Sequence, residues 1–291
     1  MIKIILMFVL SVYSENNTQI NRPEYSIEPY SVISDTKIVN EGSTLAKSPV
    51  YDVIWTLNDS GDSARIFAMD ANGKLIKPFW VKKYNGVKVV DAINIDWEAM
   101  TFDENGDILI CDCGNNYNYR RDLSIYRVSE PNPYYADQTG IIAKYPFKLP
   151  DQNKFPPENK LDWNFDIESI FVYNGYVYLI SKNRGNTNAK IYRFKNLKPF
   201  EMNIPEIYKT FDFKSMVTDA SVSPDKKNIA VLTYNYIWIF ETDGENPFGK
   251  YYYKDISLGQ CEGVSFLNNE EIVISNEEGY LFRISLKEIK K

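Results

Sequence analysis

The chain repeats one pattern of hydrophobic and polar positions five times. Each repeat begins at an acidic residue that opens a short apolar run, continues through a polar or Gly/Asn turn, and enters a run rich in Val, Ile, Leu and Tyr. Apolar runs of this length, bounded by turn residues, predict β-strands. The acids that begin the repeats are Glu41, Glu98, Glu168, Asp219 and Glu262.

The spacing of these acids predicts a β-propeller. They stand between 43 and 70 residues apart, which suits blades of four strands with outer loops of variable length. We therefore predict an all-β fold, a single β-propeller of five blades. Six blades are the alternative if the Pro-rich loop Lys148–Asp162 contains strands, and a chance placement of acids before strands would explain the pattern without a propeller.

The two ends of the pattern predict how the ring closes. Ser31–Val39 alternates as a strand before the first acid, whereas the fifth repeat ends after Tyr280–Leu286, one strand short of a blade. We expect the N-terminal strand to complete the last blade and so leave no free sheet edge. In the first blade, the turn Asp70–Gly73 predicts a hairpin, and Ile76–Val81 is expected to be the fourth strand.

The N-terminus has the features of a secretory signal. Lys3 precedes the apolar run Ile4–Val12, and Ser14 is a small residue suited to signal peptidase. Residues 1–14 are therefore predicted to be a signal peptide, 15–24 a flexible segment and 25–291 the propeller of a secreted or periplasmic protein. A retained membrane anchor is the weaker alternative. No later run approaches the roughly 18 apolar residues of a membrane span.

Composition narrows the chemistry. The formal net charge is −6 and the basic residues are scattered, so nucleic acid is not an expected partner. The chain contains no His, which excludes Ser-His-Asp triads and Cys-His pairs. Any catalysis must therefore use carboxylates, Lys, Arg, Tyr or a metal. We expect a monomer that binds a small anionic molecule or a secreted or cell-surface partner.

Three cysteines leave the disulfide pattern open. Cys111 and Cys113 stand two residues apart on one predicted strand, and Cys261 lies beside Glu262. Neighbours at this spacing rarely bond to each other, so a bond from one of them to Cys261 is one alternative. The other is that all three are small buried residues. Three cysteines without His do not make a zinc site.

The five acids predict a metal site at the axis. The inner strands of a propeller begin on one face of the disc, so their first residues converge around the central channel. Five converging carboxylates repel one another unless protons or a cation neutralise them. Oxygen ligands in this number favour Ca²⁺, with Glu41, Glu98, Glu168, Asp219 and Glu262 as candidate ligands. A water-filled channel with Lys or Arg counterions is the alternative.

A second group of polar residues follows the second strand of each of the first three blades. These loops are expected to gather above the same channel mouth and form one pocket, although such sequences are also ordinary turns. The candidate residues are Asn58, Asp59, Asp62 and Arg65 in the first blade, Asp112, Asn115, Asn116, Arg120 and Arg121 in the second, and Lys182 and Arg184 in the third.

Ordered motifs carry a resemblance to a known group of proteins. The run WTLNDSGD, the segments DWEAM and DCGNN, the pair Asp166 and Glu168, and QCEG follow one another between Glu41 and Leu286. In this order they resemble secreted bacterial propeller proteins of unassigned activity. That resemblance implies an architecture and no substrate.

A more distant similarity implies a mechanism. Trp97-Glu98, the segment Cys261–Phe266 and the acidic turn Asn58–Asp62 look like motifs of the calcium-activated nucleotidases, the apyrase family of five-bladed propellers, although order and spacing differ. The resemblance implies Ca²⁺ held by the axial acids, with Thr218 as an alternative to Asp219. It also implies a water oriented by Asp59 or Asp112, and phosphate contacts from Lys182, Arg184 and the arginines named above.

The sequence therefore predicts a secreted calcium-binding propeller that hydrolyses a phosphate ester or anhydride. Two other classes stay open: a calcium-dependent lactonase or esterase, which needs an apolar pocket for its substrate rather than Arg and Lys at the channel mouth, and a binding propeller whose calcium is structural. A glycosidase is the weakest alternative, because its two carboxyl groups need a defined separation.

Overall fold

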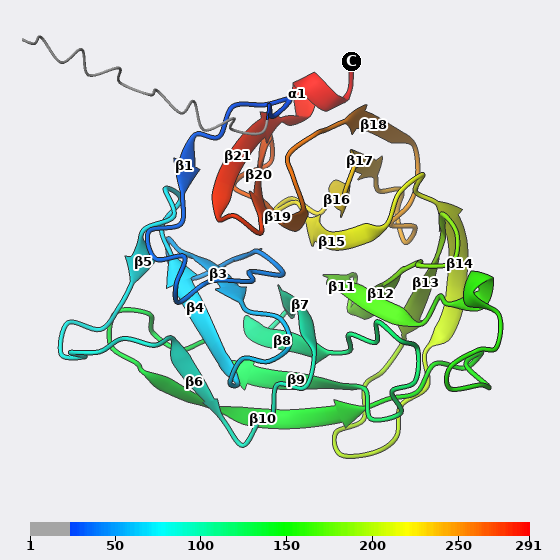
Figure 1. Cartoon of the computed structure of the whole chain (residues 1–291), viewed down its shortest axis with the longest axis horizontal. Helices are drawn as coiled ribbons and strands as arrows, with labels where there is room; N and C mark the ends of the chain where they lie inside the picture. Colours follow the sequence, from blue (N-terminus) through cyan, green and yellow to red (C-terminus); the bar gives the residue numbers. More distant parts are fainter. Residues whose placement is uncertain (1–23) are drawn as a thin grey trace, which may run out of the picture.

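The computed structural model describes residues 24–291, and the predicted signal peptide and all but the last residue of the predicted flexible segment lie outside them. Strands account for nearly all of the regular structure and are arranged as sheets around a central axis (Figure 1). The two helices described are short: the 3-10 helix η1 (Lys160–Asp162) and α1 (Leu286–Ile289). None of the helices in this part of the chain is long and apolar enough to cross a membrane.

Three of the sheets have four strands. One contains β11 (Asp166–Tyr173), β12 (Tyr176–Lys182), β13 (Asn188–Phe194) and β14 (Glu206–Asp212); the next contains β15 (Val217–Val222), β16 (Asn228–Thr233), β17 (Tyr236–Glu241) and β18 (Tyr251–Asp255). The third contains β19 (Cys261–Phe266), β20 (Glu271–Asn276), β21 (Tyr280–Ser285) and β1 (Ser31–Val32).

The fourth sheet joins two groups of strands. The first is β2 (Ala46–Lys47), β3 (Ile54–Leu57), β4 (Arg65–Met69), β5 (Leu75–Ile76) and β6 (Val87–Val90); the second is β7 (Trp97–Phe102), β8 (Asp107–Asp112), β9 (Ser124–Ser129) and β10 (Gln138–Pro146). The groups meet where β6 and β10 pair in parallel. The predicted count of five blades corresponds to a division of this sheet at that pairing, and it stays a prediction.

The inner strands surround the axis. β7, β11, β15 and β19 lie side by side in that order (Figure 1), and β2 contacts both β19 and β7. The predicted closure by the N-terminal strand is confirmed, because Ser31 pairs with Leu281 and Val32 with Tyr280. The closing strand is shorter than the predicted Ser31–Val39.

The first blade differs from its prediction at the outer edge. The turn Asp70–Gly73 does form a hairpin, in which the Gly73 amide donates to the Asp70 carbonyl at 3.0 Å. The expected fourth strand Ile76–Val81 is wrong, since β5 ends at Ile76 and β6 pairs with β4 instead. The chain between them, 77–86, leaves the sheet as a loop.

The burial of the second strands explains why they are apolar at successive positions. β3 and β16 are buried at every position, because neighbouring sheets cover both of their faces. One apolar cluster joins Leu109 to Leu179 between two neighbouring sheets, and another joins Ile180 to Val231 between the next two. Such strands read as continuous apolar runs in the sequence.

The one disulfide among the described residues joins a cysteine in β8 to one just after that strand. Cys111 and Cys113 form a disulfide, and Cys261 is free and buried. The predicted alternative of a bond to Cys261 is therefore wrong.

Candidate metal centre and active site

The same β-bulge recurs near the start of the inner strands and re-aims one side chain. In β7, β11, β15 and β19 the register with the next strand shifts by one residue, and the extra residues are Glu98, Glu168, Thr218 and Glu262. Bulges are common next to active sites because they redirect a side chain and end a ladder. Here they place three glutamates at equivalent positions around the axis.

The first blade has the same shift, but Glu41 does not stand at it. Gly42 pairs with Asn58 and Ala46 pairs with Trp55, so one extra residue lies between these pairs. Gly42 is thus equivalent to Trp97, and Glu41 is equivalent to Asp96, one residue before it. The five acids that suggested the repeat therefore do not all occupy the same position along their inner strands.

A cavity of about 180 Å³ opens at this end of the axis. Four of the five predicted metal ligands line it, namely Glu41, Glu98, Glu168 and Glu262. Four of the loop residues predicted to bind substrate or take part in catalysis line it too, namely Asp59, Asn116, Lys182 and Arg184. Ser43, Tyr234, Gln260 and Glu277 complete the polar wall.

Three carboxylates meet within ligand reach of one another. One oxygen from each of Asp59, Asp96 and Glu98 lies within 4.8 Å of the other two. Asp96 and Glu98 are buried, and Asp96 Oδ1 has no hydrogen-bond partner. Oxygen ligands from several carboxylates are the donor set that Ca²⁺ prefers, and an unpartnered buried carboxylate oxygen is costly without a cation. The group fits a calcium ion.

Sequence reasoning missed Asp96. Its signal is the spacing D-x-E, which appears as Asp96 with Glu98 and again as Asp166 with Glu168. Residues two apart on a strand face the same side of it, and here the carboxylates of Asp96 and Glu98 do reach one cluster. A pair of acids two residues apart at the start of an inner strand was therefore the better pattern to follow.

Burial and mutual repulsion raise the pKa values of Asp96 and Glu98. Burial, aided by the charge of Asp59, raises the pKa of Asp96 to about 7. Burial and the nearby charges of Glu168 and Asp59 raise the pKa of Glu98 well above its usual value. Protons and a cation are the two ways to neutralise such a group, so cation binding here competes with protonation.

Lys182 and Arg184 lie across the cavity and contact acids. Lys182 Nζ lies 3.2 Å from Glu168 Oε2, and Arg184 Nε lies 2.5 Å from Asp166 Oδ2. Burial lowers the pKa of Lys182, but Glu168 and Glu262 outweigh it and hold that pKa well above its usual range. Both cations are therefore charged and already partnered.

Glu262 is oriented by two donors. The Tyr234 hydroxyl donates to Glu262 Oε1 at 2.9 Å, and Gln260 Nε2 donates to the same oxygen at 3.2 Å. Within residues 24–291, Glu262 Oε2 accepts no protein hydrogen bond. Burial raises the pKa of Glu262, and Lys182 and the Tyr234 hydrogen bond oppose that shift. A carboxylate with one oxygen fixed and the other facing a cavity can accept a proton from a bound water.

Asp219 does not line the cavity, which corrects its prediction as a metal ligand. Its fully buried carboxylate accepts hydrogen bonds from the backbone amides of Leu45, Ala220 and Val264 and from the Thr44 hydroxyl. These donors come from β15, from β19 and from the segment just before β2, and they occupy both oxygens. Asp219 thus connects the inner strands across the axis, and the bulge residue of its strand is Thr218.

Apart from Asn116, which lines the cavity, the residues predicted in the second blade form a scaffold instead of a pocket wall. Arg120 Nη2 lies 3.0 Å from Asp112 Oδ1 in a buried ion pair, and Arg120 Nη1 donates to the Gly114 carbonyl at 2.8 Å. Asn115 is buried and accepts from the Arg120 amide at 2.9 Å. Arg121 lies over the Phe155 ring, away from the cavity. Asp112 is therefore not placed to act on a substrate there.

The first-blade loop is likewise held by its own contacts. Asn58 is buried and donates to the Ile38 carbonyl at 2.9 Å and to Asp62 Oδ2 at 2.8 Å. Arg65 pairs with Asp62 at 2.7 Å. Asn58, Asp62 and Arg65 do not line the cavity, and Asp59 is the member of this loop that reaches it.

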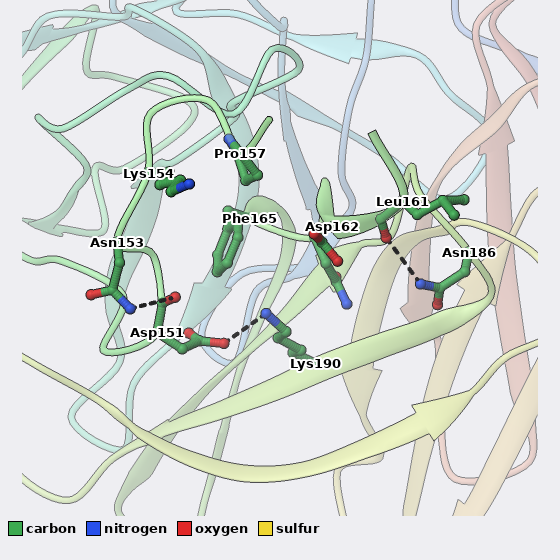
Figure 2. Close-up of a pocket in the computed structure, with 10 residues that line it drawn as sticks. Asp151, Asn153, Lys154, Pro157, Leu161, Asp162, Phe165, Asn186 and Lys190 are labelled. Atoms are coloured by element: carbon green, nitrogen blue, oxygen red, sulfur yellow. Dashed lines mark hydrogen bonds and ion pairs between the residues drawn. The ribbon is translucent and has the colours of Figure 1, made fainter. Parts of the chain in front are cut away.

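A larger cavity of about 410 Å³ lies beside the loop that joins β10 to β11 (Figure 2). Its charged groups are largely paired within the protein. Lys190 contacts Asp151 at 2.6 Å and lies over the Phe165 ring, and Lys154 pairs with Glu158 at 2.7 Å. The cavity lacks the convergent unpartnered acids of the axial one, which is the stronger candidate site.

Comparisons with known proteins give a general likeness of shape. No protein-family model matches the chain, and no curated protein matches it. A PQQ-bound aldose sugar dehydrogenase from Streptomyces coelicolor aligns with a TM-score of 0.48 and 8% identity over 89% of this chain and 98% of that one. A gluconolactonase from Xanthomonas campestris aligns with a TM-score of 0.40 and 11% identity over 90% and 86% of the two chains. We infer no activity from similarities this distant.

Proposed function

We propose that this protein is a calcium-dependent hydrolase that cleaves an uncharged carbonyl ester or lactone in the axial cavity. The observation that carries the proposal is the convergence of Asp59, Asp96 and Glu98 within ligand reach. It occurs in a cavity whose wall holds six carboxylates, Glu41, Asp59, Glu98, Glu168, Glu262 and Glu277, and two cations, Lys182 and Arg184.

The balance of charge favours an uncharged substrate over a phosphate. A wall with an excess of carboxylates repels an anion at close range. Three arginines predicted to meet phosphate, Arg65, Arg120 and Arg121, lie outside the cavity. Lys182 and Arg184 remain, but each is paired with an acid. A nucleotide would have to displace those pairs, whereas an ester or lactone would not.

The residues suggest a division of roles. Asp59, Asp96 and Glu98 would hold the calcium ion. When bound, the ion would polarise the carbonyl oxygen of the substrate as a Lewis acid. Glu262, oriented by Tyr234, would accept a proton from the attacking water. Lys182 stays protonated and would stabilise negative charge that develops on the substrate.

The disulfide supports the proposal that the protein is exported. Disulfides form and persist mainly in oxidising compartments outside the cytosol, and Cys111 is bonded to Cys113. This agrees with the predicted secretory signal at residues 1–14. N-terminal sequencing of the protein isolated from the medium or periplasm would test the cleavage site near Ser14.

A non-catalytic binding propeller is the second candidate. Tyr117 and Tyr119 are exposed and stacked at 6.2 Å between ring centroids, next in sequence to the cavity residue Asn116. Exposed aromatic pairs can hold a ligand without any chemistry. In that case the calcium ion would be structural.

An assay that separates these functions uses purified protein with excess Ca²⁺ or with a chelator. The substrates are a panel of γ- and δ-lactones, aryl acetates, and the nucleotides ADP, UDP and ATP. Calcium binding is measured separately by calorimetry. We expect calcium-dependent hydrolysis of a lactone or ester that is lost in Asp96→Asn and Glu98→Gln. The control Glu245→Gln, which removes an exposed carboxylate outside the cavity, should keep full activity.

Each other outcome has a defined meaning. Release of phosphate from a nucleotide, with no hydrolysis of the carbonyl substrates, would replace the ester proposal by the nucleotidase one. Calcium binding without turnover of any substrate would favour the binding propeller. An absence of calcium binding by the wild-type protein would remove the metal centre from all three.

A further inference from the structure

The loop between β5 and β6 exposes two large aromatic side chains at its tip. Phe79 is 84% exposed and Trp80 is 51% exposed. The Val81 amide donates to the Pro78 carbonyl at 3.1 Å, so the two aromatic residues occupy the central positions of a hydrogen-bonded turn. The loop projects outward from the ring beside β5 and β6 (Figure 1).

A second loop supports this turn and adds to its surface. Trp80 Nε1 donates to the Tyr135 carbonyl at 3.1 Å, and the Phe79 and Tyr135 rings meet edge to face at 6.2 Å. Tyr135 is itself 63% exposed, and Tyr134 beside it is also exposed. The aromatic groups therefore form one supported patch from two loops. Isolated exposed apolar side chains are normal, but a cluster of them marks an interaction surface.

Lysines surround the patch. Lys77 precedes Phe79, and Lys82 and Lys83 follow Trp80; all three are exposed. None of them has a carboxylate within 4.0 Å among residues 24–291, although many other lysines in that range are paired with acids. The protein as a whole carries a net charge of −6, so this is a local positive surface on an acidic protein. We call Lys77, Phe79, Trp80, Lys82, Lys83, Tyr134 and Tyr135 the aromatic-basic surface.

We propose that the aromatic-basic surface docks the protein reversibly on an anionic lipid bilayer. Trp and Tyr favour the boundary between lipid head groups and water, because their rings are apolar and their N–H or O–H groups are polar. Lysines near such a surface are attracted to anionic head groups, each by roughly fivefold in binding constant. An aromatic turn with lysines on both flanks matches both requirements. An acidic protein surface would match the charge, but it would not need rings that project from the tip of a turn.

Vesicle flotation tests the proposal with the purified mature protein, which lacks the predicted signal peptide 1–14, because the apolar run Ile4–Val12 would itself bind lipid. Vesicles of phosphatidylcholine alone are compared with vesicles that also contain phosphatidylglycerol. We expect binding to the anionic vesicles to be stronger by roughly a hundredfold, from three lysines, and to weaken as salt is raised. Phe79→Ser with Trp80→Ser, and separately Lys82→Glu with Lys83→Glu, should each reduce that binding at least about tenfold.

Matched controls test whether vesicle binding depends on this surface in particular or on exposed aromatic residues and lysines in general. Tyr117→Ser with Tyr119→Ser removes another exposed aromatic pair, and Lys37→Glu with Lys198→Glu reverses the same number of exposed lysines elsewhere; both should bind vesicles like the wild type. Circular dichroism and thermal unfolding confirm that all variants are folded. The proposal is overturned if the wild type binds neither kind of vesicle, or if the loop variants bind anionic vesicles as well as the wild type does. The assay does not depend on the hydrolase proposal, because it needs neither substrate nor calcium.

Discussion

The Thr44 hydroxyl donates a hydrogen bond to Asp219 Oδ2 at 3.1 Å across 175 positions of sequence. The same carboxylate oxygen accepts from the Val264 amide at 2.9 Å, and Thr44 Oγ1 in turn accepts from the Met100 amide at 3.4 Å. One buried carboxylate and one hydroxyl therefore connect segments of four inner strands. This contact satisfies backbone donors that no ladder reaches.

Asp219→Ala should destabilise the fold strongly. It leaves four buried donors without an acceptor, and each such group costs about 1 to 3 kcal/mol, so we expect a loss of at least about 3 kcal/mol in the free energy of unfolding. Asp219→Asn keeps one acceptor oxygen and should cost less. Urea unfolding measures both. Because Asp219 lies outside the cavity, the Asn variant should bind calcium normally, and a loss of calcium binding would restore its predicted role as a ligand.

Gly114→Ala should damage the metal centre directly. A Cβ at Gly114 would lie 2.5 Å from Asp96 Cγ and 2.6 Å from Glu98 Oε1, so both carboxylates would have to move. We expect the calcium dissociation constant to rise at least about tenfold, since calcium affinity depends on ligand geometry. Gly140→Ala is the matched control, because its added Cβ meets nothing within 4 Å. Equal calcium affinity of the two variants, measured by calorimetry, would count against the site.

The calcium-free protein should lose stability as pH rises. The pKa of Asp96 is raised to about 7 in the folded protein from about 3.9 when unfolded, so between these values the folded state binds more protons. Its contribution to stability is therefore present below about pH 4 and is lost as pH rises through about 7. Glu98, Glu168 and Glu262 shift in the same direction.

Thermal unfolding with a chelator at about pH 5 and about pH 8 measures this trend. Asp96→Asn should flatten it, because the amide does not titrate. Calcium competes with protons for the carboxylates, so the stabilisation by added calcium should be larger at the higher pH. A chelated protein that gains stability between these two conditions would contradict the prediction.

Glu262→Gln should separate catalysis from metal binding. If Glu262 accepts the proton from water, kcat should fall by roughly 10² to 10⁴, while calcium affinity changes little because Glu262 lies outside the three-carboxylate cluster. Tyr234→Phe removes only the donor that orients Glu262 and should cost less. Steady-state kinetics on the substrate found in the panel provide the measurement. A fall in calcium affinity that accounts for the whole loss would assign Glu262 to the metal.

The repeated apolar runs were sufficient to predict the sheets, the hairpin at Asp70–Gly73 and the closure by Ser31. The register in which neighbouring strands pair could not be predicted from the apolar runs. Glu41 and Asp219 begin apolar runs just as Glu98, Glu168 and Glu262 do. Only the pairing with the second strand shows that these two miss the bulge, which falls at Thr218 in β15 and between Gly42 and Ala46 in the first blade.

The positions of the arginine side chains could not be predicted from the sequence either. Arg120 follows the motif DCGNN at a distance that suits either a pocket or a scaffold. The choice depends on how the loop turns, and here Asn115 and Asp112 capture the Arg120 backbone and guanidinium from inside the blade. By contrast Lys182 ends β12, and Asp59 follows the bridge residue Asn58 and donates its amide to the Glu41 carbonyl, so backbone pairing fixes the position of both.

The pairing of Ser31 with Leu281 determines when the ring of sheets can close during synthesis. Of the strands described, β1 leaves the ribosome first, but it has no partner until β21, the last of them, has been made. Local hairpins can form in turn as each blade emerges, whereas the join depends on contacts at the greatest separation in the chain, which form slowly. In a nascent chain that stalls before Tyr280 the ring of sheets is therefore not closed, and the first and last sheets each expose a surface that the closed ring covers. Such a chain is a substrate for chaperones or proteases.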